Sequence, residues 1–261
     1  MKRKQKNSGG NIAYEECTII GRNAVLEAYR SGKTIDKLFV LDGCQDGPIK
    51  SILRESKKQS TLVKYVSREK LDSLSQHEKH QGVVAIAAAY EYAELEDLFA
   101  NAEKRGEDPF FILCDEIEDP HNLGAIIRTA NLAGAHGVII PKRRAVGLTG
   151  TVAKVSAGAL HYTPVARVTN LARTIDELKE RGMWFVCGDM DGELMYHQNL
   201  TGSIGLVIGN EGNGVSRLVK EKCDYIASIP MKGDIDSLNA SVATGVLAFE
   251  IVRQRMESAT K

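Results

Sequence analysis

A glycine-rich segment with a single carboxylate, "GNEGNGVS" from Gly209 to Ser216, follows the apolar run "IGLVI". Glycines at such a position permit positive φ angles and let the backbone approach a ligand closely. The segment lacks the GxxxxGK pattern followed by Ser or Thr, and no GxGxxG opens a helix after the first strand-like run of either half of the chain. We therefore expect a ligand site around Glu211 that binds neither a nucleoside triphosphate nor a nicotinamide dinucleotide, with an ordinary turn as the alternative.

A second polar segment leads from the apolar run that ends near Met231 into the last predicted helix. Its charged loop, residues 232–236, precedes Ser237 and Asn239, and the helix then begins with small residues. A helix N-terminus with free N–H groups and no bulky side chains can approach a ligand or another chain segment closely. The sequence therefore predicts that this helix start makes room for such a neighbour.

A third segment, "DEIEDPHNLGAIIRTANLAGAHG", follows the apolar run "FFILC". Asn122 occupies the position where we expect the N-cap of a helix from about Leu123 to Ala133. Arg128 lies six residues further on, among apolar and small residues. This setting predicts that Arg128 is either paired or part of a site.

Metal binding is not predicted. The carboxylates at the start of the third segment have the chemistry of a Mg²⁺ site, but a solvated loop before a helix N-terminus, where negative charge is favourable, explains them better. His77 and His80 have helical spacing and lack a third ligand nearby. Five scattered cysteines without a CxxC pair indicate neither a zinc site nor a disulfide framework.

The elements that position these segments alternate between strand-like and helical patterns. Strand-like runs cover residues 110–117, 137–141, 184–190, 204–209 and 225–231, with helical patterns at about 123–133, at 171–182 and at the end of the chain. Unbroken apolar strands joined by helices predict a parallel sheet covered on both faces. Because a doubly wound sheet binds ligands beyond the carboxyl ends of its strands, we expect the polar segments to meet there.

The first half of the chain predicts a separate, smaller α/β domain. Helical patterns that include 22–31, 49–59 and 68–74 alternate with strand-like runs at 37–41, 62–66 and 80–90. We divide the chain into a flexible basic arm at 1–15, an N-terminal domain at 16–90, an acidic linker at 91–108 and a C-terminal domain at 109–261.

The balanced net charge conceals an asymmetry. Residues 1–90 hold 16 Lys and Arg against 10 Asp and Glu, a net charge of +6, whereas the remaining residues hold 18 against 24, a net charge of −6. The first half thus suits a polyanion, with an uneven scatter of surface charge as the alternative. The longest apolar run, Val83–Tyr90, is too short to span a bilayer, and the basic N-terminus lacks the apolar core of a signal peptide, so a cytoplasmic protein is expected.

The three polar segments resemble a known family. In order and spacing, "NLGAIIRTA", "IGNEGNGVS" and "IPMKGDIDSLNASVA" are similar to the signature motifs of the SpoU/TrmH class of RNA ribose 2′-O-methyltransferases. The first half, with "GRNAVLEAYRSG" and "HQGVVA", resembles the small RNA-binding domain of the subfamily that methylates a guanosine of large-subunit (23S) rRNA.

The resemblance implies a fold, a cofactor and an assembly. The expected fold is α/β: a SPOUT-type doubly wound parallel sheet with a C-terminal trefoil knot, preceded by a small α/β RNA-binding domain. The implied methyl donor is S-adenosylmethionine. The expected partners are RNA and a second copy of the chain, with the site close to the subunit interface, and neither DNA nor a membrane is expected.

The resemblance also assigns residues to the reaction. The polar catalytic set it implies is Asn122, Arg128, Glu211, Ser237 and Asn239. Because a guanidinium is effectively always protonated, we favour a role for Arg128 in binding the target phosphate or the forming alkoxide, with Glu211 or that phosphate receiving the proton.

Further residues are assigned to the cofactor and to RNA. The implied cofactor positions are Gly209, Ile229 and Leu238, with Pro230 and Met231 beside them; Ile229 and Leu238 equally suit ordinary core positions. The implied RNA-binding residues are Arg22, Asn23, His80 and Gln81. A single-stranded or looped target is expected, because the reacting hydroxyl must be splayed toward the methyl donor.

Three other functions compete with this interpretation. A tRNA ribose methyltransferase would share the three motifs, but the separate N-terminal domain disfavours it. A noncatalytic RNA-binding protein of the same fold is disfavoured by the intact polar set. A nucleotide-binding oxidoreductase is disfavoured by the missing dinucleotide fingerprint.

Overall fold

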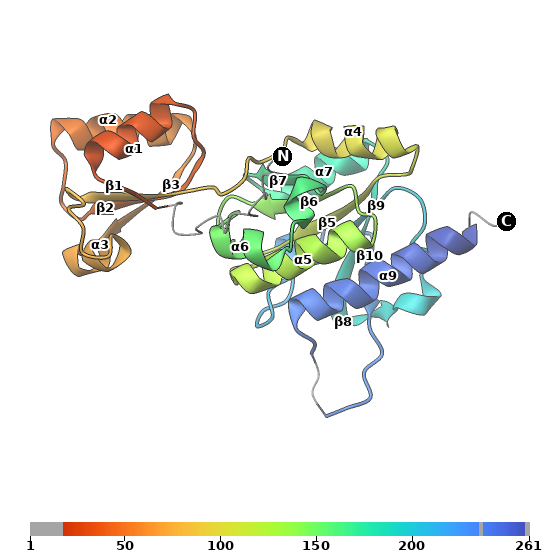
Figure 1. Cartoon of the computed structure of the whole chain (residues 1–261). Coiled ribbons are helices and arrows are strands. Elements are labelled where there is room, and N and C mark those ends of the chain that lie inside the picture. The colour runs from red at the N-terminus through yellow and green to blue at the C-terminus, as the bar shows by residue number, and fades with distance from the viewer. Residues whose placement is uncertain (1–17, 235–236, 259–261) are drawn as a thin grey trace, which may run out of the picture. The chain divides into compact units, whose positions relative to one another are not determined.

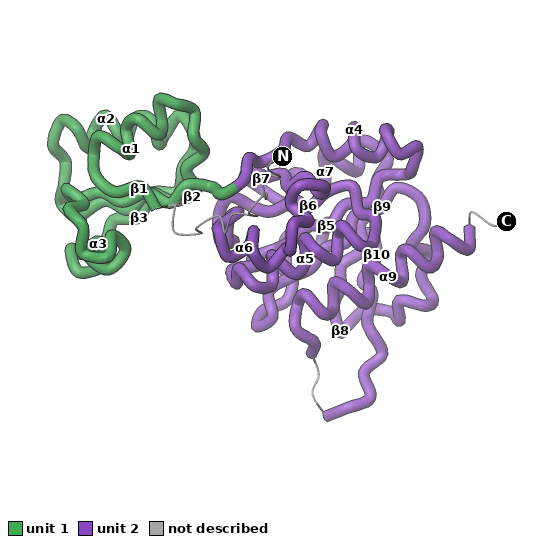
Figure 2. The backbone as a smooth tube through the Cα atoms, viewed as in Figure 1, with its two compact units in different colours: residues 1–89 green, residues 90–261 purple. Residues whose placement is uncertain are grey.

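The computed structural model describes residues 18–234 and 237–258. The chain forms two compact units, residues 1–89 and 90–261, shown in different colours in Figure 2. The predicted basic arm at residues 1–15 lies outside the described residues. In the part of the chain that is described, no helix is long and apolar enough to cross a membrane.

Unit 1 is a four-stranded mixed sheet with helices on it. Its strands β1 (Thr18–Ile20), β2 (Ile35–Leu41), β3 (Leu62–Val66) and β4 (Val83–Ala87) lie in the order β1-β4-β2-β3. Strands β2 and β3 are parallel, and β4 runs antiparallel to both of its neighbours. The helices are α1 (Arg22–Arg30), α2 (Gly47–Lys58) and α3 (Arg68–Leu74), with α1 and α2 packed together in Figure 1.

The acidic segment at residues 91–108, which the sequence predicts to be a linker, is folded as part of unit 2. It contains α4 (Leu95–Arg105), whose Leu98 and Ala102 are buried in the core of unit 2. Ala93 forms a parallel bridge with Ala166, on the outer side of the edge strand β7 (Val165–Val168). Helix and bridge tie this segment to unit 2, and the boundary between the units falls at Ala89.

Unit 2 is built on a six-stranded parallel sheet. The strands are β5 (Phe110–Cys114), β6 (Gly137–Pro141), β7, β8 (Trp184–Leu194), β9 (Ile204–Ile208) and β10 (Tyr225–Ser228), in the order β10-β8-β9-β5-β6-β7. Every neighbouring pair is parallel. The order reverses direction after β5, which makes the sheet doubly wound.

Both faces of this sheet are buried, because successive residues of a strand point to opposite sides. Phe110 and Ile112 face a core formed with α5 (Pro120–Leu132), α6 (Gly150–Val155) and α9 (Ala240–Ser258). Phe111 and Leu113 face the other core, formed with α4, α7 (Leu171–Glu180) and α8 (Arg217–Lys220). Two short 3-10 helices, η2 (Ala159–His161) and η3 (Met195–His197), complete the unit.

The beginning of α5 differs from the predicted one. The helix starts at Pro120, and the side chain of Asp119 caps it by accepting a hydrogen bond from the backbone N–H of His121. Proline suits the first helical position because its missing N–H would have no partner there. Asn122 therefore lies inside the first turn, and its side chain is free for another role.

Candidate active site

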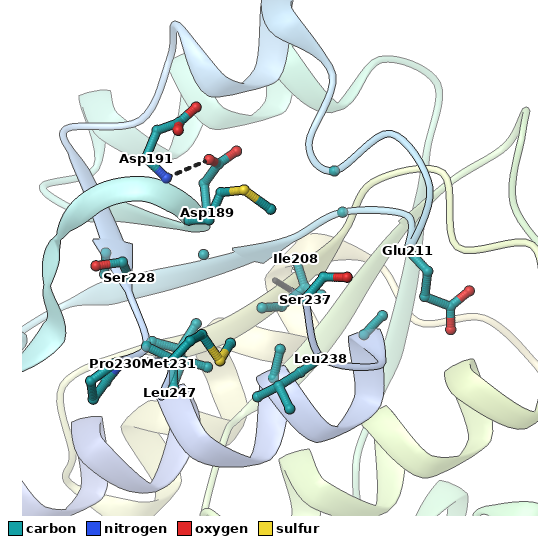
Figure 3. A pocket seen from close by; sticks show the side chains of 18 of the residues that line it. Asp189, Asp191, Ile208, Glu211, Ser228, Pro230, Met231, Ser237, Leu238 and Leu247 are labelled. Atoms are coloured by element: carbon teal, nitrogen blue, oxygen red, sulfur yellow. Dashed lines mark hydrogen bonds between the residues drawn. The ribbon is translucent and has the colours of Figure 1, made fainter. Parts of the chain in front are cut away.

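A pocket lies at the carboxyl ends of β8, β9 and β10, beside the start of α9 (Figure 3). Its volume is about 1000 Å³. All five residues assigned to the cofactor line it: Gly209, Ile229, Pro230, Met231 and Leu238. Glu211 and Ser237 line it as well. The glycine-rich segment after β9 and the segment that leads into α9 thus meet at one site, at the edge of the sheet that the parallel topology indicates.

Three polar side chains from distant segments meet at Glu211. Its Oε1 accepts hydrogen bonds from the amide of Asn122 and, at 2.7 Å, from the amide of Asn239. Asn239 also donates to Oδ1 of Asn122 at 2.9 Å. The three motifs of the resemblance each contribute one member, so the chain brings them together as the sequence predicts. Two amide donors fix the orientation of the Glu211 carboxylate, whereas its other oxygen remains available.

Asn239 holds this position because it also caps α9. Its Oδ1 accepts from the backbone N–H of Ser241 at 3.0 Å and from the Ser241 hydroxyl at 2.6 Å. The capped N–H requires an acceptor, so the oxygen must face the helix and the NH₂ must face Glu211. The same contacts therefore begin the helix and orient the Asn239 amide toward Glu211.

The glycine-rich loop is folded tightly back on itself. Asn210 and Gly214 exchange two backbone hydrogen bonds, of 3.1 and 2.8 Å. A Cβ on Gly209 would collide with the backbone of Gly214 and Val215, which explains the glycine at this position. The Asn210 side chain reaches across to the carbonyl of Glu116 in the loop after β5. The loop that presents Glu211 is thereby fastened to the loop that leads to Asn122.

Arg128 does not join this cluster. Along the helix axis it lies about 9 Å beyond Asn122, at 1.5 Å per residue. Its side chain is exposed, does not line the pocket, and has no hydrogen bond or ion pair with any described residue. Ile126, Ile127 and Ala130 point into the core, and the helical rotation turns Arg128 outward. Of the two alternatives that the sequence left open, pairing with a described residue is not observed, and a role in a site stays a prediction.

A second group of charged residues, not predicted from the sequence, lies at the pocket. Asp189 and Asp191 line it from β8, and Lys220 of α8 binds Oδ2 of Asp189 at 2.9 Å. We expected "WFVCGDM" to be a strand and gave its aspartate no role. Asp189 lies two residues after Cys187, which forms the last pair between the parallel strands β8 and β9, with Val207. A carboxylate at this carboxyl edge of the sheet is a candidate for a ligand site.

A second, smaller pocket of about 750 Å³ lies in unit 1. All four residues assigned to RNA line it: Arg22, Asn23, His80 and Gln81. Three of them, Arg22, His80 and Gln81, form hydrogen bonds with neighbouring residues of unit 1. Arg22 donates to the Gln81 carbonyl at 2.8 Å and to Asp46 at 2.6 Å, and its backbone N–H donates to Oε1 of Gln81.

His80 is 7% exposed and is likewise engaged. Its Nδ1 accepts from the backbone N–H of Gly82, so its Nε2 donates to Asp72. Of the four, Asn23 and Gln81 are exposed, Arg22 is half-buried and His80 is buried. Arg68 and Lys79, both exposed, also line this pocket and were not assigned from the sequence. The assigned residues therefore shape the pocket, and the exposed cations supply its free positive charge.

The pocket of unit 2 fits the S-adenosylmethionine that the resemblance implies. Ile208, Leu238 and Leu247 give it an apolar wall, while carboxylates lie at its rim. An adenosine joined to a sulfonium cation requires such a combination of apolar and acidic groups. The tight turn at Gly209 also keeps the backbone close to the cavity. No group of three His, Cys, Asp or Glu side chains suited to a metal ion occurs among the described residues.

Two family descriptions match the chain and divide it close to the unit boundary. Residues 109–249 match the SpoU rRNA Methylase family, and residues 18–93 match RNA 2′-O ribose methyltransferase substrate binding. A putative TrmH family tRNA/rRNA methyltransferase of Bacillus subtilis, YacO, is 53% identical over 91% of this chain and 95% of its own length. A putative TrmH family tRNA/rRNA methyltransferase of Staphylococcus aureus is 48% identical over 92% and 97%.

Solved structures share the architecture. The SpoU methyltransferase AviRb from Streptomyces viridochromogenes, in complex with the cofactor AdoMet, is 26% identical, with a TM-score of 0.58, over 92% of this chain and 90% of its own. The A. aeolicus TrmH/SpoU tRNA modifying enzyme is 28% identical, with a TM-score of 0.54, over 59% and 78%. The chain therefore belongs to the SpoU/TrmH family of RNA methyltransferases, whose methyl donor is S-adenosylmethionine.

Proposed function

We propose that this protein transfers the methyl group to a ribose 2′-hydroxyl, specifically of a guanosine in large-subunit rRNA. The observation that carries the proposal is the convergence of Asn122, Glu211 and Asn239 at the cofactor pocket. The match of unit 1 to a substrate-binding domain of RNA 2′-O ribose methyltransferases supports the choice of the hydroxyl. The choice of rRNA follows from the resemblance of "GRNAVLEAYRSG" and "HQGVVA" to the rRNA-modifying subfamily.

The chemistry requires a nucleophile in line with an electrophile. When bound, the cofactor supplies a methyl group on a sulfonium centre. A ribose hydroxyl is a poor nucleophile until its proton is removed or its developing charge is stabilised. Asn122 and Asn239 hold the Glu211 carboxylate, which we propose as the group that receives the hydroxyl proton, and Ser237 is exposed beside it. Alignment of the reacting atoms by the pocket supplies the entropic part of the acceleration.

A homodimer would complete the site. Arg128 has no partner among the described residues, and a cation is needed near the target phosphate or alkoxide. Val242, Phe249 and Met256 recur every seven residues on α9 and are 50%, 49% and 68% exposed. Such a stripe of large apolar side chains suits an interface with a second helix. We propose that the exposed faces of α5 and α9 form this interface and that Arg128 acts at the partner's pocket.

We also propose a trefoil knot in the C-terminal part of unit 2. Its support is the close packing of α9 on β8, where a Cβ on Gly188 would lie 2.6 Å from Leu247. A chain end threaded through a loop requires this kind of backbone approach, for which the small residues at the start of α9 leave room. Unit 1 is proposed to bind RNA through its pocket. Because RNA and the methyl donor occur together in the cytoplasm, we place the reaction there.

Methyl transfer to defined transcripts tests the function. The protein is incubated with S-adenosylmethionine carrying a labelled methyl group and with either rRNA or tRNA, and the modified nucleotide is mapped. A ribose 2′-O-methyl group blocks alkaline cleavage at its own phosphodiester, which distinguishes it from base methylation. We expect label in a guanosine of rRNA. Label in tRNA alone would replace the substrate, and no label in either RNA would favour a noncatalytic RNA-binding protein.

A further inference from the structure

The charge around the cofactor pocket is strongly one-sided. Among the described residues that line it, the carboxylates of Asp189, Asp191, Glu211 and Asp234 face one ammonium group, that of Lys232. Glu211 belongs to the polar cluster described above, but Asp189 is engaged with none of that cluster. It comes from the opposite side of the pocket, as Figure 3 shows.

Asp189 is held rigidly in its place. Its Oδ2 binds Nζ of Lys220 at 2.9 Å, and its Oδ1 accepts from the backbone N–H of Asp191 at 3.1 Å. Asp189 lies two residues beyond the last β8–β9 pair, Cys187–Val207, and its Oδ2 lies 3.8 Å from where a Cβ of Gly214 would be. The side chains of Asp189 and Lys220 are only 15% and 26% exposed.

Asp189 stays ionised in this setting. Burial alone would raise the pKa of its carboxyl, but the hydrogen bonds from Lys220 and from the Asp191 backbone outweigh burial and leave the pKa below its ordinary value. Lys220 is nearer to Asp189 than to Asp191, at 2.9 against 3.9 Å, and one ammonium group cannot neutralise both carboxylates. By formal charges, two carboxylates and one ammonium group leave one negative charge in excess at this wall, and the Asp191 side chain, 82% exposed, is the better solvated of the two carboxylates.

We infer that Asp189, positioned by Lys220, makes the pocket select the positively charged methyl donor over the neutral product of the reaction. S-adenosylmethionine carries a sulfonium charge that S-adenosylhomocysteine has lost, although the two share the adenosine and the amino acid. A fixed, poorly solvated carboxylate at the wall attracts the first by Coulomb interaction and leaves the second unaffected. Loss of the methyl group then weakens binding and favours product release. The inference rests on the family's cofactor in this pocket and is independent of which RNA is methylated.

Calorimetric titration of the full-length protein without RNA tests the inference. The probes are S-adenosylmethionine, S-adenosylhomocysteine and sinefungin, which carries an amine cation in place of the sulfonium. In Asp189→Asn we expect the affinity for both cationic probes to fall on the order of tenfold, with a change of less than twofold for S-adenosylhomocysteine. An equal loss for all three would mean that Asp189 recognises adenosine or the amino acid, and would overturn the inference.

Two matched variants separate charge from folding. Lys220→Gln removes the compensating cation, while the backbone N–H of Asp191 still holds Oδ1 of Asp189, so the variant is expected to shift the preference further toward the cationic probes, opposite in sign to Asp189→Asn. A fall in preference in both variants would contradict the inference. Asp176→Asn breaks a comparable ion pair with Lys222, of 2.8 Å, outside the pocket, and is expected to leave all three affinities unchanged. If the unaltered protein binds none of the probes, the cofactor assignment itself fails together with the inference.

Discussion

Asn239 shows how a single side chain can both cap a helix and orient a carboxylate of the candidate site. Its oxygen caps α9 through Ser241, and its nitrogen orients Glu211. Neither the cap nor the carboxylate can move without disturbing the other. This coupling explains why a helix that enters the core begins with polar and small residues.

Glu211→Gln should remove the part of the pH profile in which activity rises with pH. The glutamine keeps an oxygen that can accept from Asn122 and Asn239, so the cluster should persist, but an amide cannot take up a proton from the hydroxyl. Initial rates of methyl transfer, measured from pH 6 to 9 at saturating substrates, test this expectation. Glu177→Gln, on the remote helix α7, is the matched control. An unchanged profile in Glu211→Gln would assign the proton to another group.

His136 predicts a pH dependence of stability that is independent of catalysis. Burial is the main cause that lowers the pKa of its imidazole; the nearby Arg105 and Arg255 act in the same direction, and Glu107 opposes them. The neutral ring accepts from the backbone N–H of Phe110 through Nδ1. Because the folded pKa lies below the unfolded one, this stability is fully present above about pH 6.5 and is lost as the pH falls from there toward the folded pKa.

The variant His136→Asn should flatten this dependence. Its amide oxygen can replace Nδ1 as acceptor for Phe110, but it does not titrate. Melting temperatures measured at pH 7.5 and 5.5 should fall less in the variant than in the original protein, although the variant is less stable at both. An equal fall in both proteins would show that other groups dominate.

Among the elements, the predicted strands and helices largely coincide with the observed ones where the pattern is long or buried on both faces. Strand β5 and helix α7 are examples. Strand β7 was missed because it has four residues, one of them Arg167, and lies at the edge of the sheet. Helix α6 has six residues and too short a pattern to be recognised.

The residues of the candidate site likewise include some that the sequence located and others that only the structure places. The motif order located Glu211, Asn122 and Asn239, which one chain brings together. The apolar neighbours of Arg128 in the sequence do not make it a buried residue, because adjacent residues on a helix point in directions about 100° apart. Asp189 carries no motif, and only the pairing of β8 with β9 places it at the pocket.

Two glycines, Gly209 in the loop after β9 and Gly245 in α9, should respond to replacement by alanine with opposite changes in stability. Gly209→Ala would drive a Cβ into the backbone of Gly214 and Val215, which cannot move aside as a side chain can. We expect a loss of about 1–3 kcal/mol in stability and of cofactor binding. Gly245→Ala, within α9, meets no atom within 4 Å and should stabilise the protein by about 0.5–1 kcal/mol. Thermal unfolding and ligand titration check both signs, and a tolerated Gly209→Ala would show that the loop is looser than the structure indicates.

At the scale of the whole molecule, one chain contains the cofactor pocket, the polar cluster and the unit that matches a substrate-binding domain, but leaves Arg128, the cation that we propose for the reaction, outside the site. Arg128 is exposed on α5, and the apolar stripe of α9 is exposed as well. Both features are explained together if the working enzyme is a dimer. Phe249→Glu places a charge in the middle of the stripe, so sedimentation should show a shift toward monomer, and methyl transfer should fall with it.

Mixing two inactive variants tests whether Arg128 acts across the interface. Arg128→Ala and Glu211→Gln are each expected to reduce kcat by on the order of 10²–10³. In a mixed dimer, one of the two sites would combine an intact Arg128 from one protomer with an intact Glu211 from its partner. Random exchange makes half of the dimers mixed, so activity should return to about a quarter of that of the original protein, because removal of an oriented charge affects only the site that it faces.

Mixing Arg128→Ala with Asn122→Ala should restore activity in the same way, since Asn122 lies with Glu211. Mixing Glu211→Gln with Asn122→Ala should not, because both remove the same half of the site. If no mixture regains activity while the protein remains dimeric, Arg128 serves the pocket of its own chain, and α5 must shift when RNA binds.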